Sequence, residues 1–110
     1  MLAPVLIAGW CAFALAVVVG CLVPADWLPA RLPNDKLLHF VSYAVLALPI
    51  ATVTSTLAQN AAGAVILLLA GFAIEVAQHF VPGRSFCMRD MAANAAGVLI
   101  GTVIGLVAAL

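Results

Sequence analysis

The sequence predicts an all-α protein, a polytopic membrane bundle of four transmembrane helices in a single domain over residues 1–110. Composition is the first observation: 67% of the 110 residues are hydrophobic and 7% are charged, whereas a soluble domain carries roughly 25% charged residues. Four basic and four acidic side chains cannot cover a soluble domain of this size, so the lipid bilayer must cover it. A formal net charge of zero gives no electrostatic basis for nucleic-acid binding.

Four apolar runs are the second observation. A transmembrane helix needs about 20 mostly apolar residues to cross the hydrocarbon layer. The chain divides into four such runs, which we place at residues 4–23, 36–53, 61–80 and 91–110. We expect each run to form one membrane-spanning helix.

Prolines and polar residues mark the links between these helices. Pro24 ends the first helix because proline has no amide hydrogen to donate. Asn34 or Asp35 is expected to cap the second helix, and Pro49 is expected to kink it. The polar residues 54–60 are assigned to the second link.

The third link places all the charges on one side of the membrane. Pro82 and Gly83 end the third helix, and Asp90 is the expected N-cap of the fourth. With four crossings, the first and third links share a side, and all eight charged residues lie in or near those links. Basic residues in these links predict that the links are cytoplasmic. If the basic residues are there for function and not for topology, this rule misleads, so the side of the membrane on which the links lie stays open.

A stripe of small residues follows the fourth helix. Gly97, Gly101 and Gly105 recur every four residues and allow the backbone of another helix to approach closely. Packing within the bundle is favoured over a dimer or a partner protein, because a four-helix chain must first pack its own helices.

Polar residues at helical spacing form stripes near the side that holds the charges. The stripe on the second helix is Asp35, His39 and Tyr43, and the stripe on the fourth is Asp90 and Asn94. The stripe on the third helix is Glu75 and His79, with Gln78 close to Glu75, and His79 is expected to lie at the interface. Their depths agree to within one helical turn at about 1.5 Å of rise per residue. Because hydrocarbon penalises polar groups that lack partners, these residues should turn inward and form a polar pocket in one leaflet.

The pocket supplies candidates for chemistry. An ionisable residue inside the bilayer is expensive to bury, so Glu75 is expected to be functional, and His39 is a candidate general acid or base. Asp90 is a further catalytic candidate, although both it and Asp35 have an ordinary alternative use as helix caps. The candidate ligand-binding residues are Lys36, Arg84, Gln78, Asn94, Tyr43 and Asp35.

Other kinds of site find little support along the sequence. A metal site on one helix would use a Glu-x-x-His pair, but Gln78 stands three residues after Glu75. Ser42 and Ser85 belong to no recognisable nucleophile motif. We therefore expect no metal and no cofactor.

Two motifs resemble the VanZ-like family of small bacterial multi-pass membrane proteins. They are D-K-x-x-H-F-x-x-Y at residues 35–43 and E-x-x-Q-x-x-x-P-G-R at residues 75–84, followed by Asp90, Asn94 and Gly97. The resemblance covers roughly residues 34–105. It implies an envelope protein of the cytoplasmic (inner) membrane, in a family named for a member that gives low-level resistance to teicoplanin.

The leading expectation for function is a pocket that binds or processes an anionic headgroup or lipid-linked ligand. Arg84 and Lys36 would hold the phosphate, while Glu75 and His39 would be available for proton transfer. The alternatives are a small proton-coupled transporter or channel, and an accessory subunit that binds another membrane protein through the glycine stripe.

Overall fold

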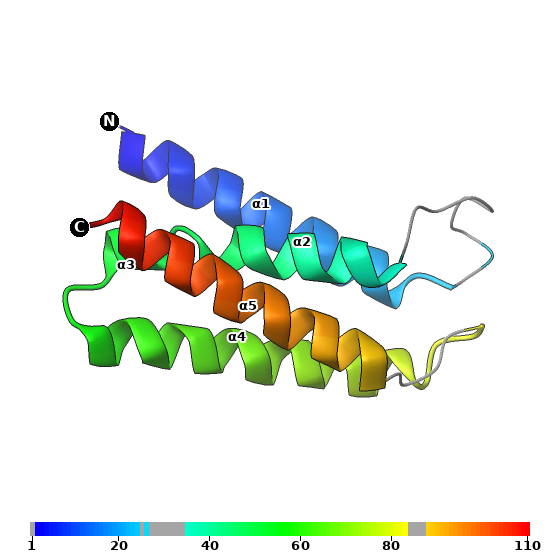
Figure 1. Cartoon of the computed structure of the whole chain (residues 1–110). Coiled ribbons are helices and arrows are strands. Elements are labelled where there is room, and N and C mark those ends of the chain that lie inside the picture. The colour runs from blue at the N-terminus through cyan, green and yellow to red at the C-terminus, as the bar shows by residue number, and fades with distance from the viewer. Residues whose placement is uncertain (1, 25, 27–34, 84–87) are drawn as a thin grey trace.

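The computed structural model describes residues 2–24, 26, 35–83 and 88–110, and this part of the chain is helical without strands (Figure 1). The helices are α1 (Leu2–Leu22), α2 (Asp35–Ala47), α3 (Ile50–Val53), α4 (Leu57–Gln78) and α5 (Met88–Ala108). Four stretches are long and apolar enough to cross a membrane, with α2 and α3 together forming one of them. The predicted all-α fold with four spans is confirmed.

The helices run alternately up and down, so that α2 and α5 begin at the end of the molecule where α1 and α4 finish. The two chain termini lie at the opposite end (Figure 1). A small core is formed by Tyr43, Leu46, Ala47, Leu67 and Val98. Many large apolar side chains elsewhere are exposed, as expected where acyl chains cover the surface.

Pro49 divides the second span into two helical pieces. α2 ends at Ala47 and α3 begins at Ile50, because proline has no N–H with which to continue the ladder. Thr52 N donates to the Pro49 carbonyl oxygen at 3.0 Å, and the Thr52 hydroxyl donates to the same oxygen at 2.6 Å. The predicted kink is therefore present as a break.

α4 begins at Leu57, inside residues 54–60, which the sequence predicts as the second link. Thr56 is its N-cap, and the side-chain oxygen of Thr56 accepts a hydrogen bond from Gln59 N at 3.1 Å. Gln59 Oε1 in turn accepts from Ser55 N at 2.7 Å, which resembles a capping box. Asn60 consequently lies within the helix and is buried, and its amide has no hydrogen-bond partner among the described residues.

The glycine stripe of α5 packs against the backbone of α2. A Cβ atom built on Gly97, Gly101 or Gly105 would lie 2.3 Å from the carbonyl oxygens of Phe40, Ala44 and Leu48, in that order. Both sets of residues advance in steps of four, so the two helices are parallel and in register. The glycine stripe therefore packs within the bundle, and α2 covers the face of α5 that a second protein would need.

α1 lies at the outside of the bundle, and side-chain hydrogen bonds at Trp10 and Cys21 link it to other described helices. None of its side chains from Pro4 onward is fully buried. Trp10 Nε1 donates to the Leu46 carbonyl oxygen at 2.8 Å, and Gln78 Nε2 donates to the Cys21 carbonyl oxygen at 2.9 Å. Leu46 and Cys21 both lie in the last turns of their helices, where carbonyl groups lack intrahelical partners.

Candidate functional site

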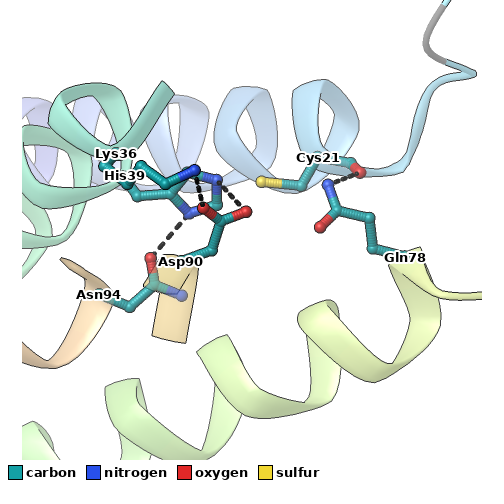
Figure 2. A network of polar contacts seen from close by, with 6 residues as sticks. All are labelled: Cys21, Lys36, His39, Gln78, Asp90 and Asn94. Carbon is teal, nitrogen blue, oxygen red and sulfur yellow. Dashed lines mark hydrogen bonds and ion pairs between the residues drawn. The ribbon is translucent and has the colours of Figure 1, made fainter. Parts of the chain in front are cut away.

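His39 on α2 is the centre of a set of polar contacts at the end of the bundle away from the termini (Figure 2). Its Nδ1 lies 2.8 Å from Asn94 Oδ1 on α5. Since an amide oxygen only accepts, Nδ1 is the donor in this hydrogen bond. The opposite ring nitrogen, Nε2, lies 3.7 Å from Asp90 Oδ2.

Asp90 joins the two helices a second time. Its Oδ1 lies 3.6 Å from the Lys36 ammonium nitrogen. This carboxylate oxygen is buried and receives no hydrogen bond from any described residue. Asp90 lies in the first turn of α5, which begins at Met88. The expectation that Asp90 is the N-cap is therefore wrong: the helix begins before it, and its carboxylate lies against α2.

Glu75 on α4 completes the group from a third helix. One ligand-type atom each from Glu75, His39 and Asp90 lie within 4.8 Å of one another. We call His39, Glu75, Asp90 and Asn94 the polar cluster. Its members are 8%, 1%, 6% and 1% exposed, respectively. The predicted meeting of three polar stripes at one depth is thus observed for these four residues.

The glycine packing of α5 on α2 sets the register of the cluster. Gly97 lies against Phe40, one residue after His39, and Asn94 lies one helical turn before Gly97. The same parallel register that seats glycines on carbonyl groups therefore places Asn94 beside His39 and Asp90 beside Lys36. Backbone packing in the middle of the bundle positions the polar groups near its end.

Two predicted site residues have mainly structural contacts. Tyr43 is buried, and its ring and hydroxyl lie 3.1 Å from the Cβ position of Gly71, so it packs α2 against α4 beneath the cluster. Gln78, one turn after Glu75, uses its amide Nε2 to hold the end of α1. Their predicted roles in ligand binding remain predictions.

Some predicted residues fall outside what the structure describes. These are Arg84, Asn34 and the side chain of Asp35, although α2 does begin at Asp35. Arg89 lies within the described residues and is exposed. His79 is exposed as well and makes an edge contact with Phe80, its ring centroid 5.3 Å away.

The comparison with protein families adds an independent finding to this geometry. The profile of the VanZ/LLP1 family matches residues 16–109. The chain belongs to this family. Neither a curated protein nor a solved structure matches it significantly. The matched segment of this VanZ/LLP1 protein includes the whole polar cluster, Lys36 and the glycine stripe.

Sequence reasoning missed one property of the cluster in this VanZ/LLP1 protein. Glu75 has no histidine three residues later on its own helix, whereas the structure brings one ligand-type residue from each of three helices together: His39, Glu75 and Asp90. No spacing along the chain signals this arrangement. Agreement in helical depth was the only available signal, and it pointed to a pocket without specifying its chemistry.

Proposed function

We propose that this VanZ/LLP1 protein binds the anionic headgroup of a lipid or lipid-linked molecule at the polar cluster, within one leaflet. The observation that carries the proposal is burial of His39, Glu75 and Asp90 together, beside Lys36, in a chain with four candidate membrane spans. Ionisable groups inside a transmembrane bundle are costly, and by default they mark functional sites.

The direction of α2 and α5 supports binding of an anionic ligand at the end of the bundle that holds the polar cluster. α2 and α5 are parallel and both begin here, at Asp35 and Met88. The N-terminus of a helix carries a partial positive charge and free N–H groups, which favour phosphate and carboxylate. Two such termini side by side would receive a headgroup entering from the interface.

Lys36 supplies a cation at the same place. Its side chain is 45% exposed, and its ammonium nitrogen lies 3.6 Å from Asp90 Oδ1. A long lysine side chain at the edge of a bundle can extend its ammonium group to a headgroup while its stem stays on the helix surface. Arg84 is proposed as a second phosphate-binding residue.

Proton transfer is available but is not required by the proposal. His39 Nδ1 donates to Asn94, so Nε2 faces the interior of the cluster, where Asp90 and Glu75 also lie. An imidazole held between carboxylates is suited to general acid and base work. Binding without turnover would satisfy the same geometry.

A binding experiment with matched cation variants tests this function. The chain in nanodiscs is compared with Lys36→Gln and Arg89→Gln, using native mass spectrometry with phosphatidylglycerol as ligand and phosphatidylcholine as control. Loss of one charge-assisted hydrogen bond costs about 1.5–3 kcal/mol, so Lys36→Gln should weaken phosphatidylglycerol binding by about tenfold or more. Arg89→Gln removes the same charge from an exposed position and should change binding less than about twofold. Equal effects of the two variants would refute the proposal.

A link with teicoplanin resistance is a separate part of the proposal and is motivated by family membership. Expression in a susceptible bacterium should raise the inhibitory concentration of teicoplanin, and Glu75→Gln at equal membrane abundance should abolish the increase. No increase with the unaltered chain would remove resistance from the proposal and leave headgroup binding to its own test.

One observation favours a proton-coupled transporter or channel as a second candidate. Buried Asn60 and the buried Thr102 hydroxyl place polar groups without hydrogen-bond partners, among the described residues, in the half of the bundle opposite the cluster. Between Asn60 and Glu75, however, the buried residues of α4 are Leu67 and Gly71. A conducting path needs a continuous polar or wet lining, so we expect proteoliposomes to show no proton flux. Flux that disappears in Glu75→Gln would establish the second candidate instead.

A further inference from the structure

We infer that His39, Glu75 and Asp90 form a binding site for one divalent transition-metal ion, with Zn²⁺ or Mn²⁺ as the best matches. The three residues come from α2, α4 and α5, are buried, and place one ligand-type atom each within 4.8 Å of one another. Two carboxylates and one imidazole are hard and borderline ligands, a combination that suits these ions.

The orientation of His39 is the first argument for a cation. Because Nδ1 donates to Asn94 Oδ1 at 2.8 Å, the neutral imidazole carries its free lone pair on Nε2. That lone pair faces Asp90 Oδ2 across 3.7 Å, a distance too long for a hydrogen bond. Two ligands bound to one metal at about 2.0–2.2 Å lie roughly 3–3.6 Å apart. The pair therefore fits around a cation after a small contraction.

The hydrogen bond that His39 donates to Asn94 has the geometry that metal sites use to hold histidine. A metal-binding histidine usually donates its other ring N–H to a carbonyl or carboxylate oxygen, which fixes the tautomer and the ring plane. Asn94 is 1% exposed and supplies that oxygen from α5, one turn from Asp90. Its position is explained by this role and is less easily explained by direct contact with a headgroup.

Asp90 supplies the second, independent argument. Asp90 is 6% exposed, yet its Oδ1 receives no hydrogen bond from any described residue. Lys36 Nζ lies 3.6 Å from Oδ1, and His39 Nε2 lies 3.7 Å from Oδ2. A buried carboxylate normally accepts hydrogen bonds or binds a metal, because an unsatisfied charge is expensive to bury. The oxygen without a hydrogen bond, Oδ1, lies on the Lys36 side of the carboxylate, and Oδ2 lies on the His39 side.

Charge balance connects this site to the proposed headgroup, and this step rests on the proposed function. With both carboxylates ionised, Glu75 and Asp90 contribute two negative charges against the one positive charge of Lys36, so these three side chains alone attract a phosphate weakly. A divalent ion makes the sum positive by one unit. Metal ions held by one or two carboxylates commonly complete their coordination with phosphate oxygens.

Metal binding is tested without lipid, on the full-length chain in detergent. The protein carries no polyhistidine tag, and Cys11, Cys21 and Cys87 are replaced by serine so that thiols bind no metal. After treatment with EDTA, isothermal titration with Zn²⁺ or Mn²⁺ and elemental analysis should show one ion per chain. Absence of binding, or a stoichiometry that does not saturate at one, would overturn the inference.

Matched variants locate the ion. His39→Gln and Asp90→Asn should abolish binding, and Asn94→Leu should weaken it by about 10- to 100-fold because it releases the imidazole. His79→Gln removes an exposed histidine near the same end of the bundle and should leave affinity unchanged. Circular dichroism confirms that each variant is helical. Binding that survives both His39→Gln and Asp90→Asn, or that falls equally in His79→Gln, would contradict the site.

Visible absorption of bound Co²⁺ provides a spectroscopic readout of the same site. Nitrogen and oxygen ligands from the protein give d–d bands that differ from those of Co²⁺ in detergent buffer, and these bands should be absent in His39→Gln. Spectra identical to those of Co²⁺ in detergent buffer would overturn the inference. Repeating the phosphatidylglycerol measurement with metal-loaded and EDTA-treated protein separates the two proposals. Lipid binding without any metal binding rejects the metal site alone, and metal binding without lipid binding rejects the proposed function alone.

Discussion

Replacing Gly101 by alanine tests whether α2 and α5 are held together through direct backbone contact. A Cβ atom at this position would lie 2.3 Å from the Ala44 carbonyl oxygen and 2.9 Å from the Ala44 Cα and carbonyl carbon. These are backbone atoms in the middle of a helix, so they cannot rotate away as the end of a flexible side chain can. The two helices must separate to admit the methyl group.

The size of the effect follows from this geometry. Carbon–oxygen contacts between packed helices are about 3.3–3.6 Å, so the approach of 2.3 Å must open by about 1 Å. Overpacking of this kind typically costs about 1–3 kcal/mol, and the higher helix propensity of alanine returns about 0.5–1 kcal/mol. We expect Gly101→Ala to lower the free energy of unfolding by about 1–2 kcal/mol.

Unfolding in mixed micelles of increasing SDS content, followed by circular dichroism, measures this difference. Gly9→Ala on α1 is the matched control, because no atom lies within 4 Å of its Cβ position. We expect Gly9→Ala to be neutral or stabilising. Gly63→Ala should fall between the two, since its nearest neighbour is the movable Ile50 side chain at 2.9 Å. If Gly101→Ala and Gly9→Ala change the free energy of unfolding by the same amount, the backbone contact between α2 and α5 does not hold the bundle together.

Two further predictions concern hydrogen bonds between helices. Asn94→Leu removes the acceptor of His39 Nδ1 and should lower the free energy of unfolding by about 1–3 kcal/mol. The double variant His39→Leu, Asn94→Leu should recover part of that loss, because neither polar group of the pair is then left unsatisfied. A double variant less stable than Asn94→Leu would contradict this reasoning. Trp10→Phe removes the bond to the Leu46 carbonyl oxygen, worth about 0.5–1.5 kcal/mol. Hydrogen exchange should then accelerate in α1 but not in α5, and uniform acceleration would show that α1 is not an independent outer helix.

Much of the fold was predictable from the sequence because hydrocarbon imposes simple rules. Length and apolarity alone give the four spans, and Pro49 gives the break between α2 and α3. The early start of α4 was also encoded, in the spacing of Thr56 and Gln59, but those polar residues were interpreted as a link. The polar composition of residues 54–60 favoured a link over the capping signal, so Asn60 was predicted outside the helix in which it lies.

The candidate site was predictable as a location and not as a geometry. Helical spacing and depth place His39, Glu75 and Asn94 on inward faces at one level, and these residues are buried together. Which atom meets which depends on the register between α2 and α5, and nothing in either helix alone states that register. Asp90 shows the consequence: its position suggested a cap, while the packing of α5 turns it toward His39.

α1 and the α2–α5 pair, which is joined through the glycine stripe, should respond differently to bilayers of different thickness. A helix longer or shorter than the hydrocarbon layer adapts by tilting, at a cost of fractions of a kcal/mol per ångström of mismatch. α1 has no fully buried side chain from Pro4 onward and is tied at Trp10 and Cys21, so it can change its tilt with little loss of packing. α2 and α5 share a backbone contact that repeats every turn and resists such movement. The chain should therefore keep the spacing of His39 from Asp90 and Asn94 in thin and thick membranes alike.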